Sequence, residues 1–178
     1  MISSKKIDSC KNIRKTPQMV PNKPGWYRWW FDEDGTSTIL KPLANLLQTS
    51  KLQQRKIDDM VYYALYFGIS KDLNKRLKWH ITQHHTASSV KSGFLSTLRQ
   101  TISALLGINM TDSENAVNDF IDKHCYLEYD CTSSHAAAKQ IEASELSSGY
   151  YPLNIQENKV LPKDVQNKLK KLRKTYKH

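Results

Sequence analysis

The ten residues from Val61 to Ser70, VYYALYFGIS, constrain the fold of this chain more than any other segment. Aromatic and β-branched residues dominate this almost continuously apolar run. Such a run predicts a strand that is buried on both faces and central in a sheet. Directly after it, Leu73, Leu77 and Ile81 recur at four-residue spacing, which predicts a helix with one apolar face. We expect Ser70 to cap this helix, so the chain passes from a buried strand straight into a basic helix.

Shorter patterns of both kinds fill the rest of the chain. We expect strands at residues 25–31 and 125–131, a turn at 32–35 and a return strand or its stub at 36–40. Helices are expected near residues 42–52, 93–106, 111–124, 133–149 and 163–174. A capping box, formed by Thr111 and Glu114, is expected to open the third of these helices. The pattern predicts an α/β (α+β) domain with a small, mainly antiparallel three-stranded sheet flanked by helices.

Positive charge is concentrated at the two ends of the chain. The net charge is +10, yet residues 1–24 hold six Lys or Arg and one acid, and residues 163–178 hold seven and one. A polyanion such as nucleic acid is the expected partner, and two solvated tails are the alternative. We expect a basic N-terminal arm over residues 1–22, a folded domain over 23–160 and a basic C-terminal helix or tail over 161–178.

Composition argues against membrane and secreted proteins. No apolar run approaches the roughly 18 residues that a membrane-spanning helix needs, and the polar N-terminus lacks the apolar core of a secretory signal. The three cysteines are odd in number and have no CxxC spacing, which indicates reduced thiols. These features predict a cytoplasmic protein without a membrane partner.

Two tripeptides, GWY at residues 25–27 and YFG at 66–68, belong to an ordered series of polar residues. The series continues with Arg76, His80, Glu142 and Asn154. In this order and spacing, over about residues 23–158, the chain resembles the GIY-YIG nuclease superfamily. Trp26 and Phe67 replace the central isoleucines of the family's tripeptides, and the interval between the tripeptides is long. The resemblance is therefore to an elaborated subgroup with an insertion.

The resemblance implies a catalytic set and two supporting residues. The catalytic set is Tyr27, Tyr66, Arg76, His80 and Glu142, and the supporting residues are Gly68 and Asn154. It gives Tyr27 the general-base or water-positioning role, while Tyr66 and His80 orient water or carry protons. Asn154 would be a structural anchor. Glu145 competes with Glu142 for the acidic role, and the family's spacing to Asn154 favours Glu142.

The chemistry of these side chains agrees with phosphodiester hydrolysis. A carboxylate such as Glu142 can hold Mg²⁺, with Mn²⁺ as an alternative ion, and the metal can stabilise a leaving oxygen. A guanidinium such as Arg76 binds phosphate oxygens in pairs. Together with the resemblance, this chemistry leads us to expect a Mg²⁺-dependent endonuclease that acts on double-stranded DNA, in a restriction-like, phage or mobile-element role, with a repair role also open. A homodimer stays open, because cutting both strands needs two active sites or sequential nicking.

Basic residues around the expected helix after residue 70 are candidates for contacts with nucleic acid. They are Lys71, Lys75, Lys78, His84 and Arg99. Arg99 is equally consistent with an ordinary surface charge.

Two alternatives remain open from the sequence. One is a nucleic-acid-binding module of the same fold that has lost catalysis. The other is a zinc hydrolase built on His80 and His84, which form an HxxxH pair. These residues could also have purely structural roles: Tyr27 and Tyr66 as ordinary strand aromatics, and Arg76 in an ion pair with a surface acid.

Overall fold

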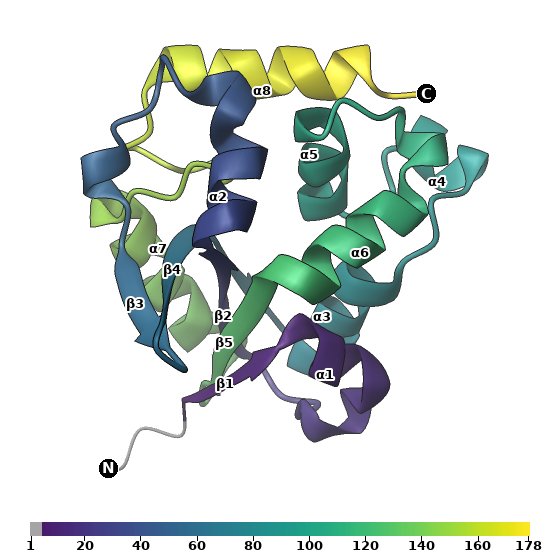
Figure 1. Cartoon of the computed structure of the whole chain (residues 1–178). Coiled ribbons are helices and arrows are strands. Elements are labelled where there is room, and N and C mark those ends of the chain that lie inside the picture. The colour runs from purple at the N-terminus through teal and green to yellow at the C-terminus, as the bar shows by residue number, and fades with distance from the viewer. Residues whose placement is uncertain (1–4) are drawn as a thin grey trace.

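An antiparallel sheet of five strands forms the centre of the computed structural model, which describes residues 5–178 (Figure 1). The strand order is β1-β5-β2-β4-β3, and each neighbouring pair is antiparallel. The strands are β1 (Lys6–Ser9), β2 (Gly25–Asp32), β3 (Gln54–Ile57), β4 (Met60–Ser70) and β5 (Cys125–Cys131). The three expected strands are thus β2, β4 and β5 at the centre, and the expected total of three is wrong because β1 and β3 extend the sheet on either side.

Helices cover both faces of the sheet. Helix α7 packs against β2 and β4 on one face, and α8 runs across the top of the molecule, packed on α5 (Figure 1). The helices are α1 (Cys10–Lys15), α2 (Glu33–Leu40), α3 (Leu73–Thr82), α4 (Ala87–Lys91), α5 (Thr97–Leu105), α6 (Glu114–His124), α7 (His135–Ser148) and α8 (Lys163–Thr175). Single 3₁₀ turns lie at η1 (Pro17–Met19), η2 (Lys41–Leu43), η3 (Thr49–Lys51) and η4 (Met110–Asp112).

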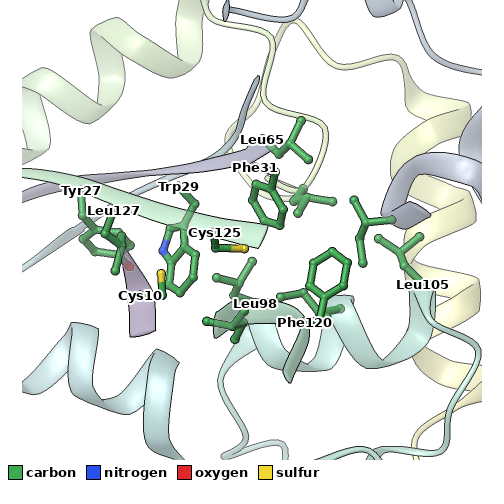
Figure 2. Close-up of a cluster of buried hydrophobic side chains, with 14 of the residues drawn as sticks. Cys10, Tyr27, Trp29, Phe31, Leu65, Leu98, Leu105, Phe120, Cys125 and Leu127 are labelled. Atoms are coloured by element: carbon green, nitrogen blue, oxygen red, sulfur yellow. The ribbon is translucent and has the colours of Figure 1, made fainter. Parts of the chain in front are cut away.

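Alternation along β2 divides the core into two clusters. Tyr27, Trp29 and Phe31 belong to the large cluster on the face of α3, α5 and α6, while Trp26 and Trp30 pack in a smaller cluster with residues of α7. Figure 2 shows the large cluster, in which the side chains of β2 meet those of α5 and α6. Since both faces of β2 are covered, apolar residues occupy both of its alternating sets of positions, and Arg28 is the one charged residue between Trp26 and Phe31.

The N-terminal segment from Lys6 to Val20 is part of the folded domain, which differs from the expected basic arm outside it. Strand β1 pairs with β5, and Cys10, Ile13 and Val20 are buried in the large cluster. The sequence did not predict this because the segment is rich in lysine, and the few apolar residues that pack in the core are widely spaced along it. The first four residues of the expected arm lie outside the described part of the chain.

The segment between β2 and β4 also differs from expectation. The expected turn and return strand form helix α2 instead, because the Asp32 side chain accepts a hydrogen bond from the Gly35 amide and caps the helix. The helix expected near 42–52 is replaced by two 3₁₀ turns, followed by β3. Strand β3 is short and polar, as edge strands often are, so its sequence carries no alternating apolar signal.

Helix α3 and helix α6 begin differently from the prediction, although both exist. Asp72, rather than Ser70, caps α3 by accepting a hydrogen bond from the Lys75 amide. Helix α6 follows Ser113 directly, so the capping box expected from Thr111 does not form. The apolar face of α3 is confirmed, because all three of its residues that were expected in the core are buried.

The state of the cysteines and the packing of the C-terminal helix complete the description of the fold. Cys10, Cys125 and Cys131 are all free thiols, as the sequence predicts. Across residues 5–178, none of the helices combines the length and the apolar character required to traverse a bilayer. The C-terminal helix is confirmed, but it is packed on the domain through Val165 and Leu169 instead of extending as a tail.

Candidate active site

Pairing of β2 with β4 brings the two tripeptides together. Tyr27 lies opposite Gly68, and Trp29 lies opposite Tyr66, so these side chains share one face of the sheet. The rings of Tyr27 and Tyr66 are 6.4 Å apart between centroids. A Cβ at position 68 would lie 2.5 Å from the Tyr27 hydroxyl oxygen. Gly68 is therefore the residue that lets the Tyr27 ring lie flat across β4.

Helix α3 adds the imidazole of His80 to the two phenols. Its Nε2 is 2.8 Å from the Tyr27 hydroxyl, and its Nδ1 is 2.6 Å from the hydroxyl of Ser96, the N-cap residue of α5. Burial, with further contributions from the charges of Arg76 and Arg99, lowers the pKa of His80 to about 3. His80 is thus neutral at physiological pH, donating at one ring nitrogen and accepting at the other.

A cavity of about 330 Å³ opens beside Tyr66. It lies between β4, α5, α7, α8 and the loop that follows α7, and Glu142 and Glu157 are its two carboxylates. Glu142 is half-buried, and its side chain makes no hydrogen bond or ion pair within residues 5–178. Burial raises its pKa, and the neighbouring charge of Glu157 adds to that effect while Lys139 opposes it. This carboxylate is available for a ligand.

Glu145, the competing acid, is fully engaged in structure. One of its oxygens lies 3.0 Å from the Arg28 guanidinium, and the other accepts a hydrogen bond from the Tyr151 hydroxyl at 2.7 Å. Arg28 also pairs with Glu128. The contacts therefore separate the two acids, because Glu145 is part of an ion-pair network on the α7 face and Glu142 has no such partner.

Arg76 and Glu142 act on the same two phenols. Burial raises the pKa of both Tyr27 and Tyr66, the charge of Arg76 lowers each of these pKa values, and the charge of Glu142 raises each of them. The Arg76 guanidinium itself is half-buried, 4.8 Å from the centroid of the Trp79 ring. A guanidinium and a carboxylate from distant parts of the sequence are thus electrostatically coupled to one pair of tyrosines.

Asn154 fixes the strand that carries Tyr66. Its Oδ1 accepts a hydrogen bond from the Phe67 amide and its Nδ2 donates one to the Phe67 carbonyl, both at 2.8 Å. The adjacent Leu153 amide donates to the Leu65 carbonyl. Strand β3 pairs with β4 only from Met60 to Tyr63. Beyond that point the loop that contains Asn154 forms hydrogen bonds with the edge of β4 next to Tyr66.

Four of the five residues expected to contact nucleic acid are exposed on the surface. Lys71, Lys75 and Lys78 are exposed around α3 and can reach a phosphate backbone. The Nζ atom of Lys75 lies 3.7 Å from Oδ2 of Asp72, which is a weak surface ion pair. His84 is also exposed, but its Nδ1 is 2.7 Å from a carboxylate oxygen of Glu114.

The expectation that Arg99 contacts phosphate is wrong, because its side chain is 0% exposed. It donates hydrogen bonds to His85 Nε2, to the carbonyls of His80 and Ile81, and to Asn118 Oδ1. These bonds tie the end of α3 to α5 and α6. Arg99 is therefore an internal crosslink that supports the helix carrying His80.

The HxxxH pair does not form a metal-ligand set. Both ring nitrogens of His80 are bonded within the protein, and His84 is paired with Glu114. In the part of the chain that the structure describes, no three His, Cys, Asp or Glu residues cluster as metal ligands. The side chains at these positions thus give the zinc-hydrolase alternative no geometric support.

Sequence reasoning did not identify Arg173, which α8 brings to the cavity. Its Nη2 donates to Gln100 Oε1 at 2.8 Å, and its charge lowers the pKa of Tyr66. Burial lowers the pKa of Arg173 itself. Apolar residues at 165, 169 and 172 already indicate that α8 packs on the domain, and this amphipathic spacing is the signal that could have placed Arg173 near the site.

The cavity is lined by Tyr66, Arg173 and the unpaired Glu142. The rings of Tyr27 and His80 lie beside Tyr66, and the charge of Arg76 acts on both phenols. Together these groups define a nuclease-type catalytic domain. The model of the GIY-YIG catalytic domain family matches residues 25–175, and the chain belongs to this family. The resemblance seen in the two tripeptides is thereby confirmed. Searches of curated proteins and of solved structures found no match to the chain.

Proposed function

We propose that this protein is a metal-dependent endonuclease that hydrolyses DNA phosphodiester bonds at the cavity beside Tyr66. The observation that supports this proposal most directly is the unpaired carboxylate of Glu142 in a cavity lined by Tyr66, because Tyr66 lies beside Tyr27, whose hydroxyl is hydrogen-bonded to a buried imidazole. A site that only binds nucleic acid needs positive charge, but it has no use for a half-buried carboxylate without a partner.

The donor set fits a hard divalent cation. Glu142 and Glu157 both line the cavity and offer oxygen ligands, and Mg²⁺ commonly binds through one or two carboxylates while it retains several waters. Glu142 would hold the ion, with Mn²⁺ accepted by the same ligand type. A bound cation would supply positive charge to a phosphoryl oxygen and to the leaving oxygen.

The side chains of the chain would share the remaining work. Arg76 would bind the non-bridging phosphate oxygens, and Arg173, which lines the cavity together with Tyr66, would be a second guanidinium. A water held next to Tyr66 would attack the phosphorus and give its proton to the Tyr27 oxygen. The Tyr27 proton would pass transiently to His80 Nε2 and then to solvent, because the low pKa of His80 makes its protonated form a strong acid. The bond between phosphorus and the leaving sugar oxygen breaks, and that oxygen takes a proton from solvent.

Basic surfaces on both sides of the cavity suit a long polyanion. The exposed lysines Lys71, Lys75 and Lys78 lie on the side of α3. On the side of α8, Lys170, Lys174 and Lys177 line a hollow next to Arg173. We propose double-stranded DNA as the substrate and a restriction-like, phage or mobile-element role, with binding that weakens steeply as salt rises.

The test compares Glu142→Gln with Glu145→Gln on supercoiled plasmid, with Mg²⁺ or with chelator. We expect wild type to cut only with the metal. Glu142→Gln should abolish cutting and leave the melting temperature unchanged, because that carboxylate has no partner. Glu145→Gln should lower the melting temperature, because it breaks the pair with Arg28, and should leave cutting intact in the folded enzyme.

Other outcomes would redirect the proposal. Salt-sensitive DNA binding without any metal-dependent cutting would indicate the inactive binding module of the same fold. Discrete fragments would indicate sequence recognition, and a smear or nicked circle would indicate cutting without it. Equal loss of activity in both glutamate variants, with equal loss of stability, would contradict the role given to Glu142.

A further inference from the structure

A second hollow, of about 610 Å³, is lined in part by Arg76. We call it the aromatic hollow, and its main walls are Ile69, Lys71, Lys75, Arg76, Trp79 and Phe94. It is separate from the cavity that contains Glu142, since the two share no lining residue. Arg76 belongs to the aromatic hollow by contact and to the catalytic group by its effect on Tyr27 and Tyr66.

Phe94 presents an aromatic surface to solvent in this hollow. Its side chain is 68% exposed, and within residues 5–178 the only other large hydrophobic residue so exposed is Met60, at 53%. Phe94 lies beside Trp79, with 5.6 Å between ring centroids and 47° between ring planes. The two rings are inclined to each other and offer faces on which a flat apolar group can stack.

Two polar nitrogens in the walls of the hollow lack partners. Neither the indole Nε1 of Trp79 nor Nδ1 of His135 has a hydrogen-bond partner within the described residues, and both atoms are buried. A buried polar group without a partner destabilises a folded protein. A ligand with hydrogen-bonding edges, admitted by a small rotation of either ring, would supply the missing partners.

We propose that the aromatic hollow holds an unstacked nucleobase of the nucleotide next to the bond that is cut. The inference rests on the proposed nuclease function. A nucleobase combines a flat π-face with polar edges, which matches the aromatic walls and the unpartnered nitrogens. Lys71 and Lys75 stand at the rim where the phosphates flanking that base would lie, and Arg76 joins the hollow to the catalytic phenols.

The charge of the rim selects this occupant over an apolar peptide or a second copy of the chain. The hollow carries three cations and one acid, Asp72, whose oxygens already bond to Asn22 and to the Lys75 amide. Arg76 lines the hollow and also acts on Tyr27 and Tyr66, so the nucleic-acid substrate is the occupant that would contact both places. The enzyme would then draw one base out of the stack and use it to fix the register of the scissile phosphate.

The experiment uses a DNA duplex with a short single-stranded gap that carries 2-aminopurine, in chelator so that nothing is cut. Stacking of 2-aminopurine on Phe94 should quench its fluorescence. Phe94→Ala should remove the quenching and weaken binding by about 5- to 150-fold, the range for loss of one base–aromatic stack. Phe94→Trp should retain both signals. Met60→Ala, the matched control at the other exposed apolar residue, should change neither.

Each outcome bears on one of the two proposals. Unchanged quenching and affinity in Phe94→Ala would overturn the aromatic hollow as a base site, even if wild type cuts plasmid. A change of oligomeric state in Phe94→Ala without any effect on the oligonucleotide would also overturn it, and would make Phe94 part of an interface. Intact quenching in a wild type that never cuts would retain the base site and refute the nuclease.

Discussion

The hydrogen bond between Tyr27 and His80 gives the sharpest test of the proposed chemistry. Tyr27→Phe removes one oxygen from a side chain that is 2% exposed and leaves the ring in place. It also leaves His80 Nε2 buried without its 2.8 Å partner. Loss of one partner from a buried polar pair destabilises a protein by about 1–3 kcal/mol. For a domain of this size that lowers the melting temperature by about 2–12 °C.

The loss of activity should be larger than the loss of stability. Removing a general base slows a reaction by about 100- to 10,000-fold, equivalent to about 3–5 kcal/mol in the barrier. We therefore expect kcat for plasmid nicking to fall by that factor at a temperature where Tyr27→Phe is still folded. Thermal unfolding followed by circular dichroism gives the stability, and nicking under saturating DNA gives kcat.

Tyr129→Phe is a matched control on the neighbouring strand. Tyr129 pairs with Tyr27 across β2 and β5, is 1% exposed, and its hydroxyl has no hydrogen-bond partner. The same chemical change should therefore leave stability equal or slightly higher and cutting unchanged. Cutting by folded Tyr27→Phe within about tenfold of wild type would refute the proton-transfer role. Equal destabilisation by the two variants would refute the importance of the bond to His80.

Three further predictions test the surroundings of the site. Gly68→Ala should destabilise the protein by about 1–3 kcal/mol and greatly reduce cutting, because its Cβ would collide with the Tyr27 ring; thermal unfolding and nicking assays check both. Arg99→Met should lower the free energy of unfolding by about 3 kcal/mol or more, measured in urea, with no change in DNA affinity for the folded protein. Burial lowers the pKa of His80 to about 3 and the pKa of His85 to about 4, whereas the ordinary value for histidine is 6.5. Between pH 6.5 and pH 4 the unfolded chain therefore binds more protons than the folded protein. The free energy of unfolding should fall as the pH drops through this range. The fall should be about 1.4 kcal/mol per pH unit for each histidine, and His85→Gln should halve the slope measured by urea unfolding at several pH values.

Strong local patterns predicted the centre of the fold well. The largely apolar runs of β2 and β4, and the four-residue spacing in α3, predicted the correct elements because burial on a sheet or helix face selects apolar residues at regular positions. Elements with little buried surface of their own were missed. Strands β1 and β3 lie at the two edges of the sheet and each pair with a single neighbour, and helix α2 depends on the cap at Asp32.

The sequence by itself determined which chemical groups the site could contain, because the tripeptides, Arg76 and His80 form an ordered series that is visible without coordinates. Only the tertiary structure decided what each charge does. Arg99 and Arg173 look alike along the chain, yet one is a buried crosslink and the other lines the cavity. Glu142 and Glu145 lie on the same helix within one turn, and the contacts of Glu145 with Arg28 and Tyr151 show which of the two is engaged in structure. The physical reason is that the role of a charge depends on its solvent exposure and its partners, and both are set by segments far away in the sequence.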